Sequence, residues 1–403
     1  MYDSLSTALL TDMYELTMLQ SALADGTAHR MCAFEVFSRR LPNERRYGVV
    51  AGTARVLEAV TNFRFTEKQL ESLDFLNQET LDYLRNYRFT GQIDGYREGE
   101  LYFPYSPIML VRGTFAECVV LETLILSILN ADSAVASAAA RMITAADGRP
   151  IIEMGSRRTN ELAAVTAARA AYLAGFTATS TLEAVHRYGI PGTGTTLLVD
   201  TYDITQGVKT AIEVAGTELG AVRIDSGDLG VMTRKVRQQL DELGAYNTQI
   251  IVSSDLDEYA IAGLRGDPVD GFGVGTSVVT GSGAPTASMV YKLVEVDGYP
   301  VAKRSLNKNS AGGSKRAIRT HRATGTAVEE IIYPFRASQP EIGNLTATML
   351  TAELMRDGEI VAGQPTLEES RAYLAHQLVT LPWEGLALSK DEPVISTRYV
   401  GFV

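Results

Sequence analysis

The amino-acid sequence predicts an α/β protein with an irregular, open (β/α) barrel and a second, mixed α+β domain from its N-terminal region. Three observations predict this fold: the length, a run of strand–helix units, and a region of mixed helical and strand-like segments on either side of that run. At 403 residues the chain is too long for one ordinary core. Between about residues 150 and 300, short apolar runs alternate with segments of helical periodicity, which is typical of βα units and a parallel sheet. Five or more such units favour a barrel, complete or open, over a single nucleotide-binding half.

The predicted βα units follow one another in a regular order. The first apolar run, "RPIIEMGS", precedes the helical "NELAAVTAARAAYLAG", whose final glycine suits a helix C-cap. The next three runs, each followed by a helical segment, are "TLLVDTYD", "AVRIDSGDL" and "QIIVSSDLD". The last run is "DGFGVGTSVV". We expect residues 126–330 to form the barrel domain.

The flanking regions mix both kinds of element. Residues 1–125 combine helical segments such as "TARVLEAVTNF" with strand-like "CAFEVFSRR", which predicts an α+β domain. Residues 331–403 are expected to pack on the first two domains. A hairpin is predicted at "VYKLVEVDGYPVAKRS".

Composition limits the possible partners and compartment. The net charge of −11 argues against nucleic acid or an anionic membrane as the main partner, but allows small phosphorylated ligands. Two cysteines, Cys32 and Cys118, are too few for a disulfide framework or a cysteine-built zinc site, and suit a reducing cytoplasm. The first residues do not have the pattern of a signal peptide. The most apolar segment, "CVVLETLILSIL", is short and contains Glu122, so we expect a buried helix and not a membrane span.

Polar residues gather where the predicted strands end, which is where a barrel of βα units carries its chemistry. They are Glu153, Arg157 and Arg158; Asp200 and Asp203; Arg223, Asp225 and Asp228; Ser253, Ser254 and Asp255; and Gly273, Gly275 and Thr276. A single aspartate at such a place is commonly only a helix N-cap. Five successive strand ends with Arg, Asp or Gly-x-Gly favour a binding site instead.

The residue types indicate what this site would hold. The guanidinium group of arginine can bind two oxygens of a carboxylate or phosphate at once. Aspartates accept hydrogen bonds from sugar hydroxyls or bind a metal. A Gly-x-Gly-Thr turn offers backbone N–H groups to a phosphate. Together they predict a pocket for an anionic sugar phosphate and a second small anion. Farther along, Lys303, Lys308 and Lys315 form either a solvated basic loop or a flexible cover for phosphates or a nucleotide.

Seven segments, in this order, resemble nicotinate phosphoribosyltransferases of the type II phosphoribosyltransferase family. They are "LLTDMYELTM", "FEVFSRRLP", "YGVVAG", "EMGSRRT", "LLVDTYD", "VRIDSGDL" and "DGFGVGTSVVT", and they span nearly the whole chain. The resemblance implies an enzyme of NAD biosynthesis that forms nicotinate mononucleotide and diphosphate from nicotinate and 5-phosphoribosyl 1-diphosphate. It also implies coupled ATP hydrolysis, a Mg²⁺ cofactor, and a cytoplasmic homodimer with shared active sites.

By this resemblance, the N-terminal region contributes to the neighbouring subunit's site. Tyr14 would stack on the pyridine ring there, with Asp12 beside it, and Arg39 and Arg40 would meet phosphates across the interface. From the residues alone, Tyr14 could equally be a half-buried aromatic at a helix start, and the two arginines the exposed end of an edge strand.

The same resemblance assigns roles to the strand ends. Arg157 would hold the nicotinate or phosphate anion, with Arg158 as second choice, and Ser180 could donate to the substrate carboxylate. Arg223 would contact phosphate and Asp225 the ribose hydroxyls. The residues that would fix the ribose 5-phosphate end are Asp255, Gly275 and Thr276. Ser254 stands where the family has glycine, which puts a close backbone approach there in doubt.

A histidine that the resemblance implies does not stand in the expected pattern. In the family, ATP coupling runs through a phosphorylated histidine just after "GIP", which Asp200 would orient. The four histidines, which are His29, His186, His321 and His376, lie elsewhere. Either the protein lacks this segment, or the sequence omits a loop of the protein between Pro191 and Thr195. The second explanation is favoured because neighbouring parallel strands need a crossover of about a dozen residues.

Other functions remain open at this stage. One is phosphoribosyl transfer to nicotinamide or quinolinate, although the hydroxyl of Ser180 suits an acid better than an amide. Another is a catalytically silent homologue that binds a sugar phosphate but cannot use ATP, if the histidine segment is truly absent.

Overall fold

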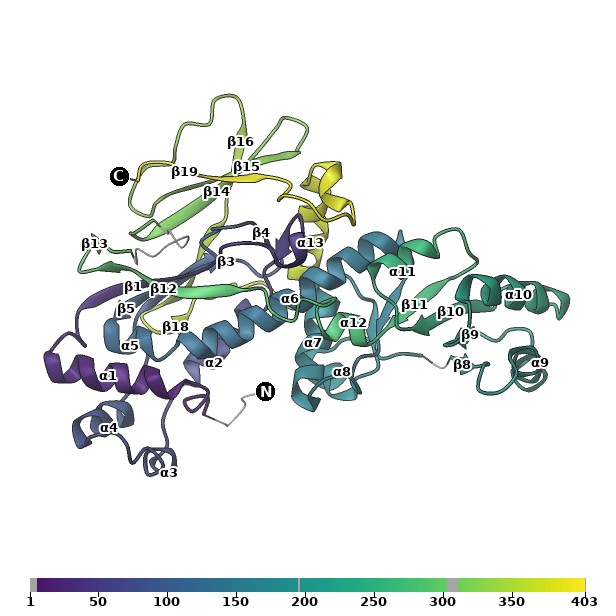
Figure 1. Ribbon diagram of the computed structural model, residues 1–403, viewed down its shortest axis with the longest axis horizontal. Helices are drawn as coiled ribbons and strands as arrows, with labels where there is room; N and C mark the ends of the chain where they lie inside the picture. Colours follow the sequence, from purple (N-terminus) through teal and green to yellow (C-terminus); the bar gives the residue numbers. More distant parts are fainter. Residues whose placement is uncertain (1–5, 195, 303–310, 403) are drawn as a thin grey trace. The chain divides into compact units, whose positions relative to one another are not determined.

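The computed structural model describes residues 6–194, 196–302 and 311–402, which form two compact units (Figure 1). The first unit comprises the described residues of Met1–Ser133, Thr286–Gly385 and Lys390–Val403, and the second comprises Ala134–Pro285 and Leu386–Ser389. Each unit is described by itself below.

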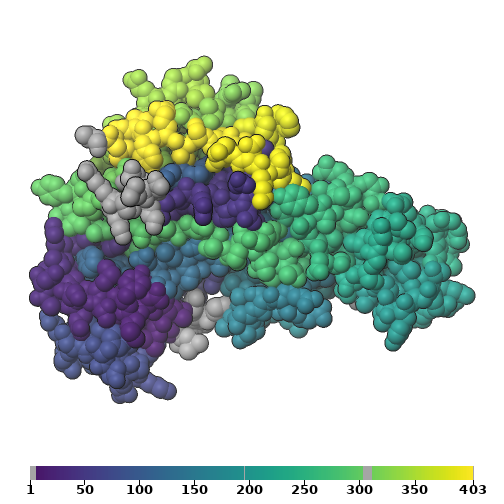
Figure 2. Space-filling model, viewed as in Figure 1, coloured from purple at the N-terminus to yellow at the C-terminus, as the bar shows by residue number. Residues whose placement is uncertain are grey.

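This division differs from the expected domains. Residues 286–330 were expected in the barrel, yet they belong with the N-terminal region because β12 (Met289–Val296) pairs with β1 (Met31–Ser38). The C-terminal residues also join the first unit, because β17 (Thr351–Arg356) pairs with β3 (Gln92–Tyr96). In the space-filling view, yellow C-terminal residues lie against light green residues of this unit (Figure 2).

The second unit contains the predicted barrel strands. Its six-stranded sheet consists of β6 (Ile151–Glu153), β7 (Ala178–Thr179), β8 (Leu197–Leu198), β9 (Ala221–Ile224), β10 (Gln249–Ser254) and β11 (Gly271–Val274). The order is β7-β6-β11-β10-β9-β8, and all neighbours are parallel. The helices between them are α7 (Glu161–Leu173), α8 (Leu182–Tyr188), α9 (Ile204–Ala215), α10 (Leu229–Glu242), α11 (Glu258–Gly263) and α12 (Thr276–Val279). Figure 1 shows β9, β10 and β11 side by side, with α9 and α10 beyond them. The prediction of an open α/β barrel is confirmed.

The barrel is open between β7 and β8, the two edge strands, and the chain after Pro191 passes from one edge to the other. Gly192 forms a parallel bridge with Thr179, and the Thr179 N–H donates to the Pro191 carbonyl at 3.0 Å. Leu197 then pairs with Val222 of β9. The crossover argument had assumed that β8 lies beside β7. β8 lies beside β9 instead, so β7 and β8 are not neighbouring strands and the crossover rule does not apply to them.

The first unit is built on a seven-stranded antiparallel sheet in the order β13-β12-β1-β5-β3-β17-β18. Its other strands are β5 (Met109–Thr114), β13 (Tyr299–Pro300) and β18 (Glu359–Ile360). A four-stranded sheet contains β14 (Lys315–His321), β15 (Ala327–Pro334), β16 (Thr346–Met349) and β19 (Ser396–Tyr399), and a two-stranded one contains β2 (Gly48–Val49) and β4 (Leu101–Tyr102). The helices are α1 (Met13–Asp25), α2 (Thr53–Thr61), α3 (Glu67–Leu70), α4 (Gln78–Arg85), α5 (Phe115–Val119) and α13 (Leu367–Thr380), with short 3₁₀ turns at Pro42–Glu44 and Trp383–Leu386. The long helix α6 (Glu122–Ala146) belongs to this unit up to Ser133 and to the second unit from Ala134.

The predicted hairpin is present as β12 and β13. Val296 faces Tyr299, so Asp297 and Gly298 alone form the turn. Both have positive φ angles, 49° and 82°. A two-residue turn of this kind matches the twist of antiparallel strands and favours Asp-Gly.

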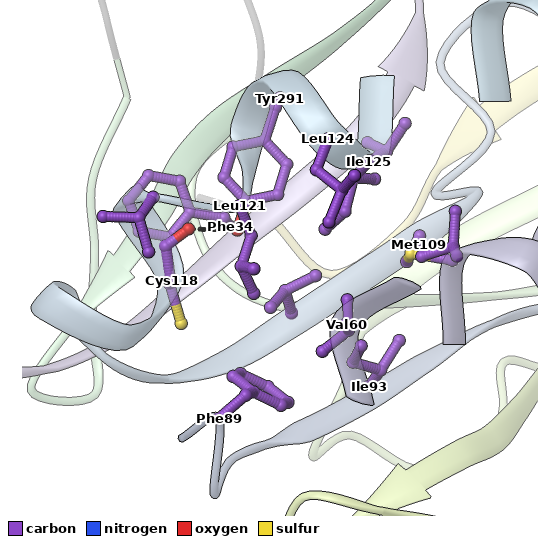
Figure 3. Close-up of a cluster of buried hydrophobic side chains, with 14 of the residues drawn as sticks. Phe34, Val60, Phe89, Ile93, Met109, Cys118, Leu121, Leu124, Ile125 and Tyr291 are labelled. Atoms are coloured by element: carbon purple, nitrogen blue, oxygen red, sulfur yellow. Dashed lines mark hydrogen bonds between the residues drawn. The ribbon is translucent and has the colours of Figure 1, made fainter. Parts of the chain in front are cut away.

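The core of the first unit lies between the large sheet and helices α2, α5 and α6 (Figure 3). The rings of Phe34 and Tyr291 stack with centroids 4.8 Å apart, and the Tyr291 hydroxyl donates to the Cys118 carbonyl at 2.9 Å. The helical stretch Phe115–Ala146 is long and apolar enough to cross a membrane, but 67% of its most apolar window is buried inside the protein. The prediction of a buried helix is therefore confirmed for this segment.

A buried charged cluster also belongs to the first unit. Arg319 is fully buried and donates to the carboxylates of Glu100 and Glu330 and to the Leu101 carbonyl. The hydroxyls of Tyr96 and Tyr373 donate to Glu330 and Glu100 respectively. Burial raises the pKa of Glu330, although Arg319 opposes the shift. The one guanidinium thus compensates two buried carboxylates.

Candidate active site

A polar pocket of about 260 Å³ lies at the carboxyl ends of β6, β9, β10 and β11 in the second unit. It is lined by Met154, Arg157, Arg158, Arg223, Asp225, Ser253, Ser254, Asp255, Gly273, Gly275 and Thr276. Seven of them are residues to which the family resemblance assigns a role: Arg157, Arg158, Arg223, Asp225, Asp255, Gly275 and Thr276. The strand ends therefore converge on one concave site, as the βα pattern predicts.

Hydrogen bonds from its neighbours fix Asp225 at this pocket. The Ser253 hydroxyl donates to Asp225 Oδ1 at 2.8 Å. The backbone N–H of Asp225 and the hydroxyl of Ser226 both donate to Asp200 Oδ2, each at 2.7 Å. Asp200 does not line the pocket itself. It holds the loop that carries Asp225.

Two neighbouring aspartates are helix caps. Asp203 accepts from the Gln206 N–H at the start of α9, and Asp228 accepts from the Val231 N–H at the start of α10. Each satisfies a backbone donor that a helix start leaves free. Asp225 and Asp255 face the pocket instead, so the structure separates the capping aspartates from the candidate site.

Three guanidinium groups give the pocket a cationic character. Arg157 and Arg158 are exposed at its edge. Arg223 is half-buried, and its Nε is buried with no hydrogen-bond partner within the described parts of the chain. Buried polar atoms are normally satisfied, so this N–H is free for a ligand. Carboxylate and phosphate oxygens are the acceptors that guanidinium groups bind best.

The glycines of β11 allow the strand ends to pack closely. A Cβ atom at Gly273 would lie 2.7 Å from Met154 Sδ and 3.1 Å from Ser253 Cβ. A Cβ atom at Gly275 would lie 3.1 Å from the Met154 carbonyl oxygen. Ser254, at the position where glycine was expected, is exposed at the pocket.

Ser180 does not line the pocket. It is exposed directly after β7, and its N–H donates to the Glu153 carbonyl at 2.9 Å. Glu153 itself is buried, and sequence reasoning assigned it no role. Its place in the sequence could have indicated one, because a carboxylate at the end of a buried apolar strand needs hydrogen-bond partners.

The other predicted residues belong to the first unit. Tyr14, at the start of α1, is 45% exposed, and burial together with Glu122 raises the pKa of its hydroxyl. Asp12 precedes α1 but its side chain does not cap the helix. The guanidinium of Arg39 lies 5.6 Å from the centroid of the Phe37 ring, and Arg40 is exposed.

The lysines require a correction. Lys303 and Lys308 lie outside the described residues. Lys315 is fully buried, and its Nζ lies 3.0 Å from Glu35 Oε2 and 3.0 Å from the Gly313 carbonyl. Its donors are used inside the fold, so its predicted role as a phosphate ligand does not fit this structure.

The sequence of the chain is similar to that of known enzymes. Residues 9–130 match the model of the nicotinate phosphoribosyltransferase (NAPRTase) N-terminal domain. A nicotinate phosphoribosyltransferase of Mycobacterium tuberculosis (strain ATCC 25618 / H37Rv) is 57% identical, over 97% of this chain and 95% of that protein. The chain belongs to the nicotinate phosphoribosyltransferase family. A Bacillus subtilis (strain 168) nicotinate phosphoribosyltransferase is 38% identical over 76% of this chain and 70% of its own.

Solved structures support the fold of this family member. Human nicotinic acid phosphoribosyltransferase has a TM-score of 0.81 and 22% identity, covering 96% of this chain and 97% of its own. Nicotinate-nucleotide pyrophosphorylase from Pyrococcus furiosus has a TM-score of 0.79 and 24% identity, covering 94% and 97%.

This chain is shorter than its mycobacterial relative within the aligned region. The alignment has 428 positions and covers 97% of the 403 residues, which is about 391, so about 37 positions have no residue of this chain.

Proposed function

We propose that this protein is an enzyme that transfers the phosphoribosyl group of 5-phosphoribosyl 1-diphosphate to nicotinate, in NAD biosynthesis. The observation that carries the proposal is the pocket itself, in which three arginines, two aspartates and a glycine-rich turn meet at the strand ends. Such a pocket suits a sugar phosphate together with a second anion. Family membership gives the reaction.

Different site residues bind different parts of the two substrates. Arg157 holds the nicotinate carboxylate or a phosphate, with Arg158 beside it. Ser180, which lies after β7 and outside the pocket lining, is proposed to donate to the carboxylate from there. Arg223 binds phosphate oxygens through its free Nε, and Asp225 accepts hydrogen bonds from the ribose hydroxyls. The residues that bind the 5-phosphate end are Asp255, Gly275 and Thr276.

The chemistry is a displacement at C1 of the ribose. The C1–oxygen bond breaks and its electron pair leaves with the diphosphate, while the lone pair of the pyridine nitrogen forms the new C1–nitrogen bond. The guanidinium groups balance the negative charge of the leaving group, and the carboxylate of Asp225 stabilises the positive, oxocarbenium-like sugar. Positioning and electrostatics therefore supply most of the catalysis.

Mg²⁺ is proposed as the cofactor, held by substrate phosphates together with Asp225 or Asp255. In the described residues, no group of three or more His, Cys, Asp or Glu side chains could hold a metal ion alone. Mg²⁺ commonly binds through one or two carboxylates plus substrate phosphates, so the two pocket carboxylates fit it. When bound, it would neutralise charge on the departing diphosphate.

ATP is proposed as a co-substrate only for a form of the protein that carries the family's histidine. Gly192, Thr193 and Gly194 follow Pro191, and Asp200 accepts hydrogen bonds from Asp225 and Ser226. His186, on α8, is the one histidine in the sequence of the second unit. The 403-residue chain therefore offers no histidine in the place that Asp200 would orient.

We predict that the purified 403-residue chain forms nicotinate mononucleotide at the same rate with and without ATP. The measurement uses labelled nicotinate, 5-phosphoribosyl 1-diphosphate and Mg²⁺. ATP-stimulated turnover would contradict the prediction and point to another phosphate acceptor. No product in either condition would support the silent, sugar-phosphate-binding alternative. Competition with nicotinamide and quinolinate tests the remaining alternatives.

We also propose a cytoplasmic homodimer with shared sites. The exposed apolar face of α1 and the turn before it, Leu10, Met13, Tyr14 and Met18, is 43–66% exposed and would be covered by a second copy. Cys32 and Cys118 are both free and buried, as a reducing compartment allows.

Shared sites predict complementation between two weakened variants. Tyr14→Ala and Asp225→Asn damage different subunits of one site, so mixed dimers keep one site with both residues intact. An equimolar mixture, dissociated and reassembled, is expected to recover about a quarter of wild-type turnover. A mixture no more active than the mean of the two variants would contradict shared sites.

A further inference from the structure

Glu153 is a buried carboxylate at the end of β6, next to the candidate pocket. Its side chain is 0% exposed. Its carboxylate accepts hydrogen bonds from one backbone N–H group and two threonine hydroxyls. Burial raises its pKa and these hydrogen bonds lower it. A buried carboxylate of this kind needs a specific reason, because its burial is costly.

The two carboxylate oxygens hold two different strand ends. One oxygen accepts from the backbone N–H of Gly155, which stands two residues before Arg157. The other accepts from the hydroxyls of Thr179, at 2.6 Å, and Thr181, at 3.3 Å. Ser180 is the residue between these two threonines. One side chain therefore links the loop that carries Arg157 with the turn that carries Ser180.

Other contacts reinforce the same link. The backbone carbonyl of Glu153 accepts from the Ser180 N–H at 2.9 Å. The hydroxyls of Thr181 and Ser156 lie 2.5 Å apart, which joins the two segments a second time. A Cβ atom at Gly155 would lie 2.2 Å from Val279 Cγ1 and 2.9 Å from Glu153 Oε1, so this close packing requires glycine at position 155.

We propose that Glu153 is a positioning residue that sets Arg157 and Ser180 relative to each other and so determines recognition of the acid group of the pyridine substrate. The inference rests on the proposed function, in which Arg157 and Ser180 meet the nicotinate carboxylate. A carboxylate can accept from all three donors at once. The amide of glutamine has only one acceptor oxygen, so its NH2 group would either face the Gly155 N–H or force the threonine hydroxyls to turn and accept.

The test is Glu153→Gln, which keeps the shape and exchanges one acceptor for a donor. We expect the KM for nicotinate to rise by between about tenfold and one hundredfold, as expected for a misplaced binding group. The KM for 5-phosphoribosyl 1-diphosphate and kcat should change much less, because Arg223, Asp225 and Asp255 keep their supports. A purely structural role would not produce this split.

Glu258→Gln is the matched control. Glu258 is also buried in the second unit, where it pairs with Arg141 at 3.1 Å and accepts from Ser282. This variant is expected to unfold more easily while the ratio of the two KM values stays at the wild-type value.

Thr181→Val keeps the inference testable if Glu153→Gln does not fold. It removes one donor to Glu153 without loss of shape, and the Thr181 hydroxyl does not cap α8. The nicotinate KM should rise selectively here too, by a smaller factor. If the wild type is active and the folded variants raise both KM values equally, or neither, the positioning role is overturned. A wild type without product would refute the proposed function instead.

Discussion

Replacement of Asp225 by asparagine is expected to lower kcat/KM by about 10²–10³-fold, the usual cost of removing one preorganised electrostatic group. The carboxylate lies in the pocket with Ser253 donating to it, and asparagine can occupy the same space. What is lost is the negative charge opposite the cationic sugar. The loss should appear in kcat as well as in kcat/KM, because the charge acts mainly in the transition state. Steady-state rates measure the loss of transition-state stabilisation, and the Kd for 5-phosphoribosyl 1-diphosphate measures any loss of substrate binding.

Asp228→Asn is the control three residues away. Asp228 caps α10 through the Val231 N–H, and asparagine is an equally good N-cap. This variant should keep wild-type activity and stability. Equal losses in both variants would mean that the loop, and not the charge at Asp225, determines the rate.

The candidate site could be predicted because its residues lie at strand ends. In a parallel sheet, residues far apart in sequence come together there by topology alone, so Arg157, Arg223 and Asp255 needed no contact information. Asp203 and Asp228 also follow strand ends, because helix N-caps occupy the same stretch of chain. Only the structure, which shows where the helices start, distinguishes these caps from the pocket residues.

The parts that could not be predicted depend on long-range pairing. Lys315 has the composition of a basic loop, and only its partner Glu35, 280 positions away, shows it to be buried. The domain boundary failed for a similar reason, since β12 joins β1 across the whole barrel sequence. Periodicity reports which face of a segment is apolar and gives no information on the partner strand. Glu153 is an intermediate case, because its position was visible but its three donors were not.

The second large effect is expected in the first unit, where Arg319→Met should lower the free energy of unfolding by about 3–5 kcal/mol. Methionine fills similar space, but it leaves Glu100 and Glu330 buried without a cation. Urea denaturation monitored by circular dichroism measures the loss. The exposed pair Arg356–Glu353 supplies the control, and Arg356→Met there should leave the unfolding midpoint almost unchanged.

The pH dependence of this loss follows from Glu330. Burial already raises the pKa of Glu330 in the folded protein, and removal of Arg319 raises it further because the guanidinium opposes the shift. A carboxyl whose folded pKa lies above its unfolded value takes up a proton on folding, so stability rises as the pH falls through the folded pKa. The deficit of Arg319→Met should therefore be largest near pH 8 and shrink toward pH 5. A deficit independent of pH would mean that lost packing, and not uncompensated charge, destabilises the variant.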